Sequence, residues 1–325
     1  MIDPFLLLAP FLVLLIVGLL GFVGCDVILG VSGADEAPTL VATPGDQKAF
    51  LSWNTDGFGE FTLQRNAAPD NSVTNLPPQP AGTASFIDTG LINGTTYTYS
   101  ITSSKNGESA GTSQASVTPE PITFRQFVEN VETVGNATVA TLPFPSLGQG
   151  SLVIVWIWYH SGTESVSTVT DNANNMYKRA VGPTPGANQL AGQQQEIWYL
   201  ENVNAGNNVI VTAQFSAGFN NEKSITAHEY TGAAPTDALE ATAMDTQATA
   251  TPSSGNATVA QSSLIFGAAI FSGSGTADTA AGFNARSTIK ANASEDRRIT
   301  APGSVAATFI APSVEDWIAQ MATFR

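Results

Sequence analysis

Short segments in which apolar and polar residues alternate are the feature that most limits how this chain can fold. Residues 49–53 (AFLSW), 61–65 (FTLQR) and 97–101 (YTYSI) each alternate with a period of two. That period places every second side chain on one face of a β-strand, whereas an amphipathic helix needs a period of 3.6. No long run after residue 122 sustains the helical period. We therefore predict an all-β protein beyond its N-terminal segment.

The charge balance and the single cysteine limit the partners and the stabilising chemistry. Lys and Arg total 12 against 27 Asp and Glu, a formal charge of -15. Such a chain repels a phosphate backbone, so we expect no nucleic-acid partner. Cys25 is the only cysteine, which excludes an intrachain disulfide and a cysteine-based zinc site. At 325 residues the chain can form two cores.

The N-terminal segment, residues 1–31, is predicted to be a hydrophobic helix. Residues 4–25 carry no charge, and about 20 apolar residues suffice to cross a bilayer. One alternative is a cleaved secretory signal, although Asp3 stands where a basic region is usual and the first lysine is Lys48. A second alternative is lipidation of Cys25, because residues 22–25 (FVGC) resemble a lipobox. We favour the uncleaved helix, serving as a membrane anchor or an assembly helix.

Glycines in this segment suggest how the helix associates. Gly18, Gly21 and Gly24 recur every three residues, and small residues at such spacing let two helices approach closely. Their other interpretation is the ordinary tolerance of glycine in membrane helices. The predicted partners are therefore other copies of the same helix or membrane lipid.

After a linker at 32–37, residues 38–121 are predicted to form a small β-sandwich. Trp53 lies on an early alternating segment, and Leu91 precedes Tyr97 by six residues in LINGTTY. These features resemble a fibronectin type III domain, in which such a tyrosine forms a corner. The resemblance implies that Trp53, Leu91 and Tyr97 are structural core residues, and that the Tyr97 hydroxyl bonds backbone a few residues upstream.

Residues 122–325 are expected to form one larger jelly-roll-like β-sandwich. About a dozen strand-like runs occur there, and residues 152–159 (LVIVWIWY) are apolar at every position, which predicts a central strand covered on both faces. Residues 316–324 are expected to form a paired strand. The hexapeptide GNATVA occurs at 135–140 and at 255–260. It reflects either pseudo-symmetry between two halves or chance.

Several stretches of this part resemble a β-sandwich module that recurs in secreted bacterial surface proteins, often beside fibronectin type III domains. The stretches are VTD at 169–171, NMY at 175–177, EIWY at 196–199, NV at 202–203 and EYTG at 229–232. The resemblance implies a location and a fold, and no general activity.

One metal site is a candidate, in residues 171–175 (DNANN). Asp171 and Asn175 offer the oxygen ligands that calcium prefers. The segment lacks the spacing of an EF-hand, and Asx-rich tight turns are common. We predict no other cofactor.

Catalytic patterns are present but lack their required context. Residues 107–111 (GESAG) match a nucleophile pattern that needs a strand, a turn and a helix, yet they fall in a predicted β-hairpin. The two histidines, His160 and His228, are expected to be ordinary sandwich residues. Four carboxylates could serve glycoside hydrolysis, but nothing in their spacing along the sequence identifies a catalytic pair among them. They are Glu196, Glu229, Glu240 and Asp296.

An aromatic group offers a sugar-binding interpretation. Trp156, Trp158, Trp198 and Tyr199 could build a flat stacking platform, although core packing is the simpler role for the first two. We predict a non-enzymatic extracellular or cell-surface protein, structural or adhesive, held in a membrane or in a surface filament by residues 1–31. The alternative is a carbohydrate-binding surface module whose partners are glycans.

Overall fold

The computed structural model describes residues 37–105, 108–133, 135–275, 277–311 and 313–325. In these residues the structure is β-strands with one short 3-10 helix, Asn188–Leu190, so the predicted all-β fold is confirmed. The predicted helix at 1–31, with Gly18, Gly21 and Gly24, lies outside the described residues. Within the described ranges, no helix has the length and apolarity to cross a membrane.

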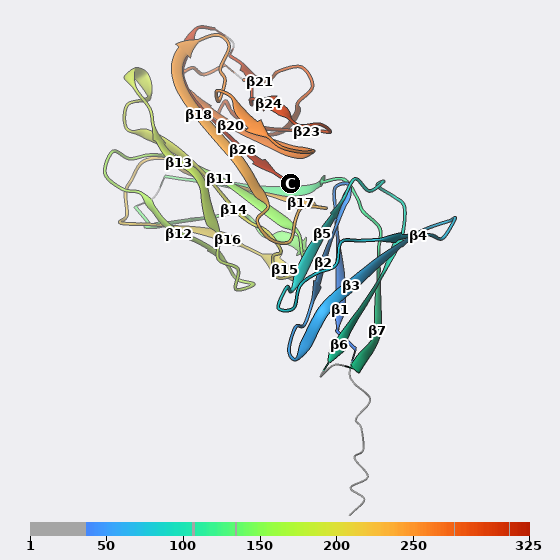
Figure 1. Ribbon diagram of the computed structural model, residues 1–325. Helices are drawn as coiled ribbons and strands as arrows, with labels where there is room; N and C mark the ends of the chain where they lie inside the picture. Colours follow the sequence, from blue (N-terminus) through green and yellow to red (C-terminus); the bar gives the residue numbers. More distant parts are fainter. Residues whose placement is uncertain (1–36, 106–107, 134, 276, 312) are drawn as a thin grey trace, which may run out of the picture. The chain divides into compact units, whose positions relative to one another are not determined.

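The first sandwich consists of two antiparallel sheets (Figure 1). One has the order β1-β2-β5 and the other the order β4-β3-β6-β7. The strands are β1 (Leu40–Gly45), β2 (Lys48–Trp53), β3 (Phe58–Ala67), β4 (Ser72–Asn75), β5 (Ser85–Thr89), β6 (Tyr97–Lys105) and β7 (Glu108–Val117). The alternating segments of the sequence lie in β2, β3 and β6, because one face of each strand is buried between the sheets.

The core of this sandwich contains the three residues that the resemblance predicted. Trp53, Leu91 and Tyr97 are all buried in one apolar cluster. The Tyr97 hydroxyl accepts a hydrogen bond from the backbone N–H of Ile92 at 3.0 Å. The predicted tyrosine corner is therefore confirmed.

The next segment builds a second sandwich around a five-stranded sheet of order β13-β14-β11-β17-β8. Smaller sheets, β12-β16-β9 and β10-β15, cover one face of it through a shared apolar core. The strands are β8 (Thr123–Glu132), β9 (Thr138–Ala140), β10 (Phe144–Leu147), β11 (Leu152–His160), β12 (Val166–Asp171), β13 (Lys178–Pro185), β14 (Gln193–Leu200), β15 (Gly206–Val209), β16 (Val211–Phe215) and β17 (Lys223–Thr231).

The last segment builds a third sandwich around a five-stranded sheet of order β18-β26-β20-β23-β22. Short sheets, β19-β24 and β21-β25, cover one face of it. The strands are β18 (Leu239–Thr249), β19 (Ala257–Val259), β20 (Ser263–Phe271), β21 (Asp278–Thr279), β22 (Asn284–Ile289), β23 (Asn292–Ile299), β24 (Gly303–Val305), β25 (Phe309–Ile310) and β26 (Glu315–Phe324).

Two sandwiches of one design replace the single large sandwich expected over residues 122–325. In each five-stranded sheet the first strand of the segment lies beside the last, and the remaining strands follow in the same order. This interleaving is of the jelly-roll type. The repeated hexapeptide contributes β9 in one sandwich and β19 in the other, at equivalent positions. The pseudo-symmetric interpretation of the repeat is therefore confirmed, while the domain boundaries at residues 37 and 121 stay predictions.

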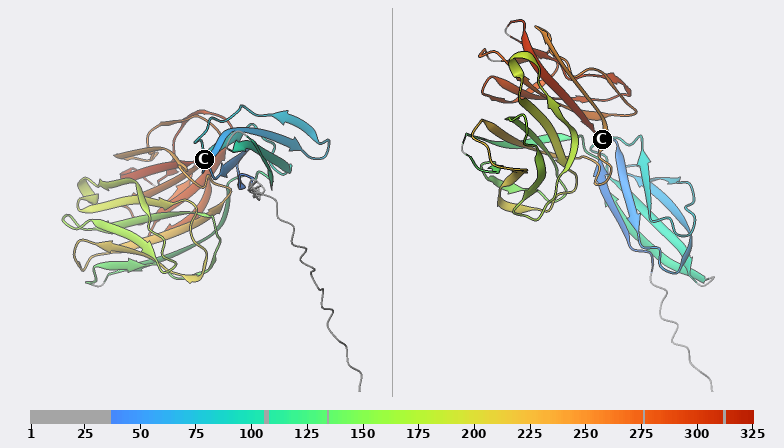
Figure 2. Two further views of the ribbon diagram at one scale, coloured as in Figure 1. Left: turned by 60° about the horizontal axis from the view of Figure 1, so that its bottom comes forward. Right: turned by 90° about the vertical axis from the view of Figure 1, so that its left-hand side faces the viewer.

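A fourth apolar core, between the two five-stranded sheets, explains why the sequence did not reveal the number of sandwiches. Residues of β11, β14 and β17 share one buried cluster with residues of β20 and β26, so the two five-stranded sheets pack face to face (Figure 2). Each of these sheets is thus covered on both faces. The strands β20 and β26 are buried at every position, and β11 at every position except His160. Such strands lose the alternation that would have marked a sandwich boundary.

The strand at the C-terminal end is central rather than peripheral. β26 pairs with β18 on one side and with β20 on the other. All ten of its residues are buried. The predicted paired strand at 316–324 is confirmed.

Candidate functional site

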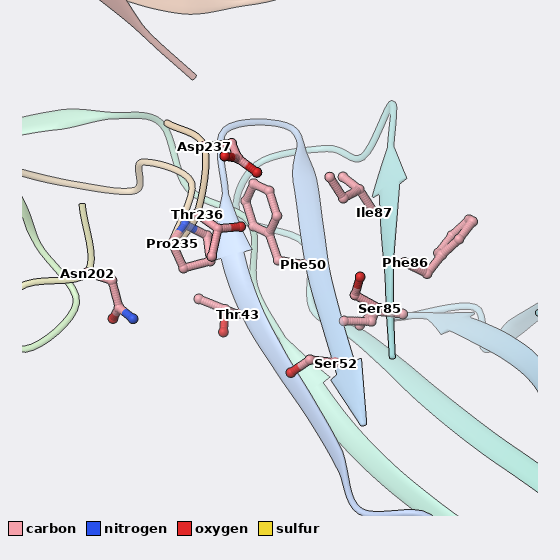
Figure 3. A pocket seen from close by; sticks show the side chains of 11 residues that line it. Thr43, Phe50, Ser52, Ser85, Phe86, Ile87, Asn202, Pro235, Thr236 and Asp237 are labelled. Carbon is pink, nitrogen blue, oxygen red and sulfur yellow. The ribbon is translucent and has the colours of Figure 1, made fainter. Parts of the chain in front are cut away.

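A cleft of ≈ 440 Å³ lies against the outer face of the sheet β1-β2-β5. This volume is within the range of about 300–1,000 Å³ that is usual for small-molecule sites. One wall is formed by side chains of the sheet, and the other by residues that follow β14 and β17. Figure 3 shows the two walls from close by.

The sheet wall is positioned by the alternation of β2. Ala49 and Leu51 point into the first core, which turns Phe50 and Ser52 outward. Cross-strand register then extends the wall into rows, because Phe50 pairs with Thr43 of β1 and Ile87 of β5, while Ser52 pairs with Ser85. Directly paired residues share a face of the sheet, so an aromatic ring, an aliphatic chain and three hydroxyls line this side.

The opposite wall is a short loop and one asparagine. Pro235, Thr236 and Asp237 come between β17 and β18, and Asn202 follows β14. Thr236 and Asp237 are exposed, and Asp237 has a φ of 51°, a conformation that Asp and Asn tolerate better than most residues. The backbone carbonyl of Asp237 accepts a hydrogen bond from Arg325 Nε at 3.0 Å, which ties the loop to the end of β26.

Several polar side chains of this cleft have no hydrogen-bond partner among the residues that the structure describes. In the described ranges, no residue donates to or accepts from the side chains of Ser52, Ser85, Thr236 or Asp237. No Lys or Arg belongs to the lining. The nearby Lys178 already forms an ion pair with Glu201 at 2.7 Å, and this hydrogen bond raises the lysine pKa. The lining of the cleft therefore offers hydroxyl, amide and carboxylate groups and no cationic side chain.

A second cleft, of ≈ 270 Å³, contains ionisable groups that are already paired. Arg286 contacts both oxygens of Asp296, at 2.6 and 2.9 Å, and its guanidinium lies 3.9 Å from the centre of the Phe124 ring. Tyr230 donates to Asp296 at 2.8 Å, and burial, followed by the aspartate charge, raises the pKa of that phenol well above its usual value. Every ionisable group of this network is paired, so its role is structural; we call these residues the Arg286 brace.

The carboxylates considered for glycoside hydrolysis are separated, each in its own internal network. Glu196 bonds Tyr159, Trp198 and Arg179. Glu229 accepts from Gln126, Gly148 and Ser151. Glu240 accepts from Ala260 and Ser263, and Asp296 belongs to the Arg286 brace. Among described residues no two of these four share a hydrogen-bond partner, so each carboxylate is held by its own set of internal contacts.

The two histidines also lie apart. His228 is opposite Ile154 on β11, six positions before His160, which corresponds to about 20 Å along a strand. His160 is exposed, whereas burial lowers the pKa of His228 to about 3 and its Nε2 lies 3.0 Å from Ser294 Oγ. His228 is thus a neutral core residue.

The predicted calcium ligands form a turn held by its own hydrogen bonds. One oxygen of Asp171 accepts from the backbone N–H groups of Ala173 and Asn175, and the other from the Asn175 amide and the Tyr177 hydroxyl. The Asn175 amide also pairs with the backbone of Asn204. This is the Asx-turn alternative. Over the described ranges, no three His, Cys, Asp or Glu residues come together in a way that could hold a metal ion.

The aromatic platform expected as one alternative is not present. Trp156, Trp158, Trp198 and Tyr199 are all buried, with exposed fractions of 0, 3, 6 and 7%. They are divided between two cores, because neighbouring residues of β14 face opposite sides of the sheet. The aromatic residues that line the cleft are instead Phe50 and Phe86, which the sequence analysis did not single out. The alternation of β2 predicts that Phe50 points outward, but it does not predict that the loop at 235–237 faces this residue.

Comparisons with known proteins find only distant structural similarities. A scan against protein families and a search of curated proteins both find no match. The chain is similar in structure to a two-domain fibronectin type III segment of chicken tenascin, at 16% identity and a TM-score of 0.23, over 58% of this chain and 98% of that one.

Two further similarities have the same weight. One is to the FN1–FN3 domains of chicken CNTN1, at 12% identity and a TM-score of 0.22, covering 89% of this chain and 93% of that one. The other is to a carbohydrate-binding module of the β-sandwich superfamily, at 9% identity and a TM-score of 0.19, covering 60% and 96%. Scores this low carry no argument about function.

Proposed function

We propose that the chain is a non-enzymatic, adhesive protein of an extracellular surface. The observation that carries this proposal is that charged groups are paired inside the sandwiches, whereas polar groups without a partner line the open cleft. Several buried carboxylates of the sandwiches are used in internal ion pairs such as Arg286–Asp296 and Arg179–Glu196, while the open cleft at Phe50 presents unpaired hydroxyls. General acid–base catalysis needs a positioned acid and base. A cleft of hydroxyl groups beside one carboxylate suits binding instead.

The composition supports a location outside the cytoplasm. The stretch at 4–25 carries no charged residue and has the length and apolarity of a membrane anchor or a secretory segment. On intact cells, a membrane-impermeant amine reagent should label the protein, because the side chains of Lys178 and Lys290 are 57 and 56% exposed. A cytoplasmic protein serves as the control. Labelling that requires cell lysis would contradict the proposed location.

The N-terminal segment, residues 1–31, is proposed as the part that holds the protein in place. Its apolar side chains need lipid or copies of the same segment around them. Gly21→Leu should weaken assembly of the full-length chain, measured by sedimentation and negative-stain imaging, while circular dichroism stays unchanged. Val23→Leu, which also enlarges a residue of the same segment, is the matched control. Full-length protein that is monomeric without detergent, or a mature chain that begins beyond Cys25, would refute this part of the proposal.

A further inference from the structure

We propose that the cleft between the β1-β2-β5 face and residues 235–237 is a binding site for a neutral saccharide. This inference deepens the proposed adhesive function by naming the class of ligand, and it rests on that function. Three independent properties of the cleft carry it: an apolar stacking surface, a set of unpaired polar groups, and a charge that rejects anions.

The stacking surface consists of Phe50 and Ile87, which lie side by side on β2 and β5. Phe50 is partly buried, since it also packs against the core shared by the two five-stranded sheets, and this contact fixes the ring in place. Ile87 is 47% exposed. In the view of Figure 3 the Phe50 ring is directed toward Thr236 and Asp237, while Phe86 is turned away. A held ring with an aliphatic neighbour matches the C–H face of a pyranose.

The polar groups surround this surface with both donors and acceptors. Ser52 and Ser85 lie in the row beside Phe50 and Ile87, and Thr236 and Asp237 face them across the cleft. A hydroxyl donates and accepts, whereas a carboxylate only accepts and can bind two neighbouring hydroxyls at once. Saccharides present vicinal hydroxyls of this kind. Because these side chains have no partner in the described protein, a ligand displaces only water from them.

The charge of the cleft selects neutral ligands. Its only ionisable lining residue is Asp237, and no Lys or Arg lines the cleft to pair with a phosphate, sulfate or uronate group. The cations beside it bond other groups, because Arg325 Nε donates to the Asp237 carbonyl and Lys178 pairs with Glu201. The chain as a whole carries -15. An anionic ligand would therefore meet repulsion both in the cleft and on approach.

The test uses the full-length protein in a detergent without a sugar headgroup, since glycosidic detergents would compete. The probes are neutral gluco-, galacto- and manno-configured oligosaccharides, together with sulfated and uronate counterparts. Binding is followed by saturation-transfer NMR and calorimetry. Asp237→Asn keeps the shape and the tolerated backbone conformation, and Ser52→Trp fills the cleft. Asp56→Asn and Ser109→Ala, which change exposed residues outside the cleft, are the matched controls.

We expect at least one neutral oligosaccharide to bind. Asp237→Asn should weaken its binding about ten-fold, and the control variants should leave it unchanged. Ser52→Trp should abolish it, and if that variant does not fold, Asp237→Asn alone decides. No binding to any probe, a preference for anionic counterparts, or equal binding by the cleft and control variants would overturn the inference. Surface labelling with no saccharide binding would refute this inference and leave the proposed location standing.

Discussion

A buried carboxyl in the third sandwich should make the stability of the protein fall as pH rises through neutrality. Glu295 lies on β23 with no exposed surface, and its Oε1 accepts a hydrogen bond from the Thr308 N–H at 3.1 Å. Its Oε2 is buried and unpartnered within the described residues. Burial is the largest cause that raises the pKa of Glu295, to about 9. The carboxyl is therefore neutral in the folded protein at pH 7.

The size of the effect follows from proton linkage. Between pH 4.5, the ordinary value for this carboxyl, and pH 9, the folded state keeps a proton that the unfolded state has released. Folded protein is then favoured at low pH, and each pH unit upward costs about 1.4 kcal/mol. At pH 7 the accumulated loss relative to acidic solution is roughly 3 kcal/mol. Glu295→Gln removes the titration and should abolish this component.

The assay is unfolding in urea at several values between pH 5 and pH 9, with amide exchange on β20 and β23 to isolate the third sandwich. The difference between wild type and Glu295→Gln should grow with pH, because only wild type carries the linkage. Glu222→Gln, at a side chain 41% exposed, is the control and should follow wild type. Parallel stability curves for wild type and Glu295→Gln would refute the reasoning.

Three further changes test the packing. Tyr97→Phe leaves the Ile92 N–H without its acceptor and should lower the unfolding free energy by about 1–3 kcal/mol in urea; a wild-type midpoint would contradict this. Deleting residues 317–325 removes most of a central strand, so a soluble truncation that melts cooperatively would disprove its role. Arg298→Met leaves the fully buried Asp46 without its ion-pair partner and with the Asn93 amide as its remaining hydrogen-bond donor. It should cost about 3–5 kcal/mol by thermal or urea unfolding, with partial recovery when Asp46→Asn is added; a cost under 1 kcal/mol would argue against the pair.

The first sandwich was predictable because its signals are local. The alternation in residues 49–53 and 97–101 indicates which side chains face inward. The spacing of Leu91 and Tyr97 predicts the tyrosine corner. The sequence around Asp171 did not distinguish a calcium site from an Asx turn, because both use the same short run of Asp and Asn residues. An Asp at 171 can bind an ion or its own backbone, and only the positions of Asn175 and Tyr177 decide.

The candidate cleft was not predictable, because its two walls are far apart in the sequence. Ser52 and Phe50 read as ordinary outward residues of a strand, and residues 235–237 read as a connecting loop. The aromatic residues that looked suited to sugar stacking, such as Trp156, are buried because a second sheet covers the face that they occupy.

By itself, the sequence determined the β class, the core of the first sandwich and the paired strand at 316–324. These depend on the period of side chains along one strand, which is a property of neighbouring residues. Only the tertiary structure decided that residues 122–325 form two sandwiches, and which polar groups remain unpaired in the cleft. Both depend on which sheets pack together. A strand buried on both faces has the same apolar sequence pattern whichever sheet covers it, so its sequence does not reveal its packing partner.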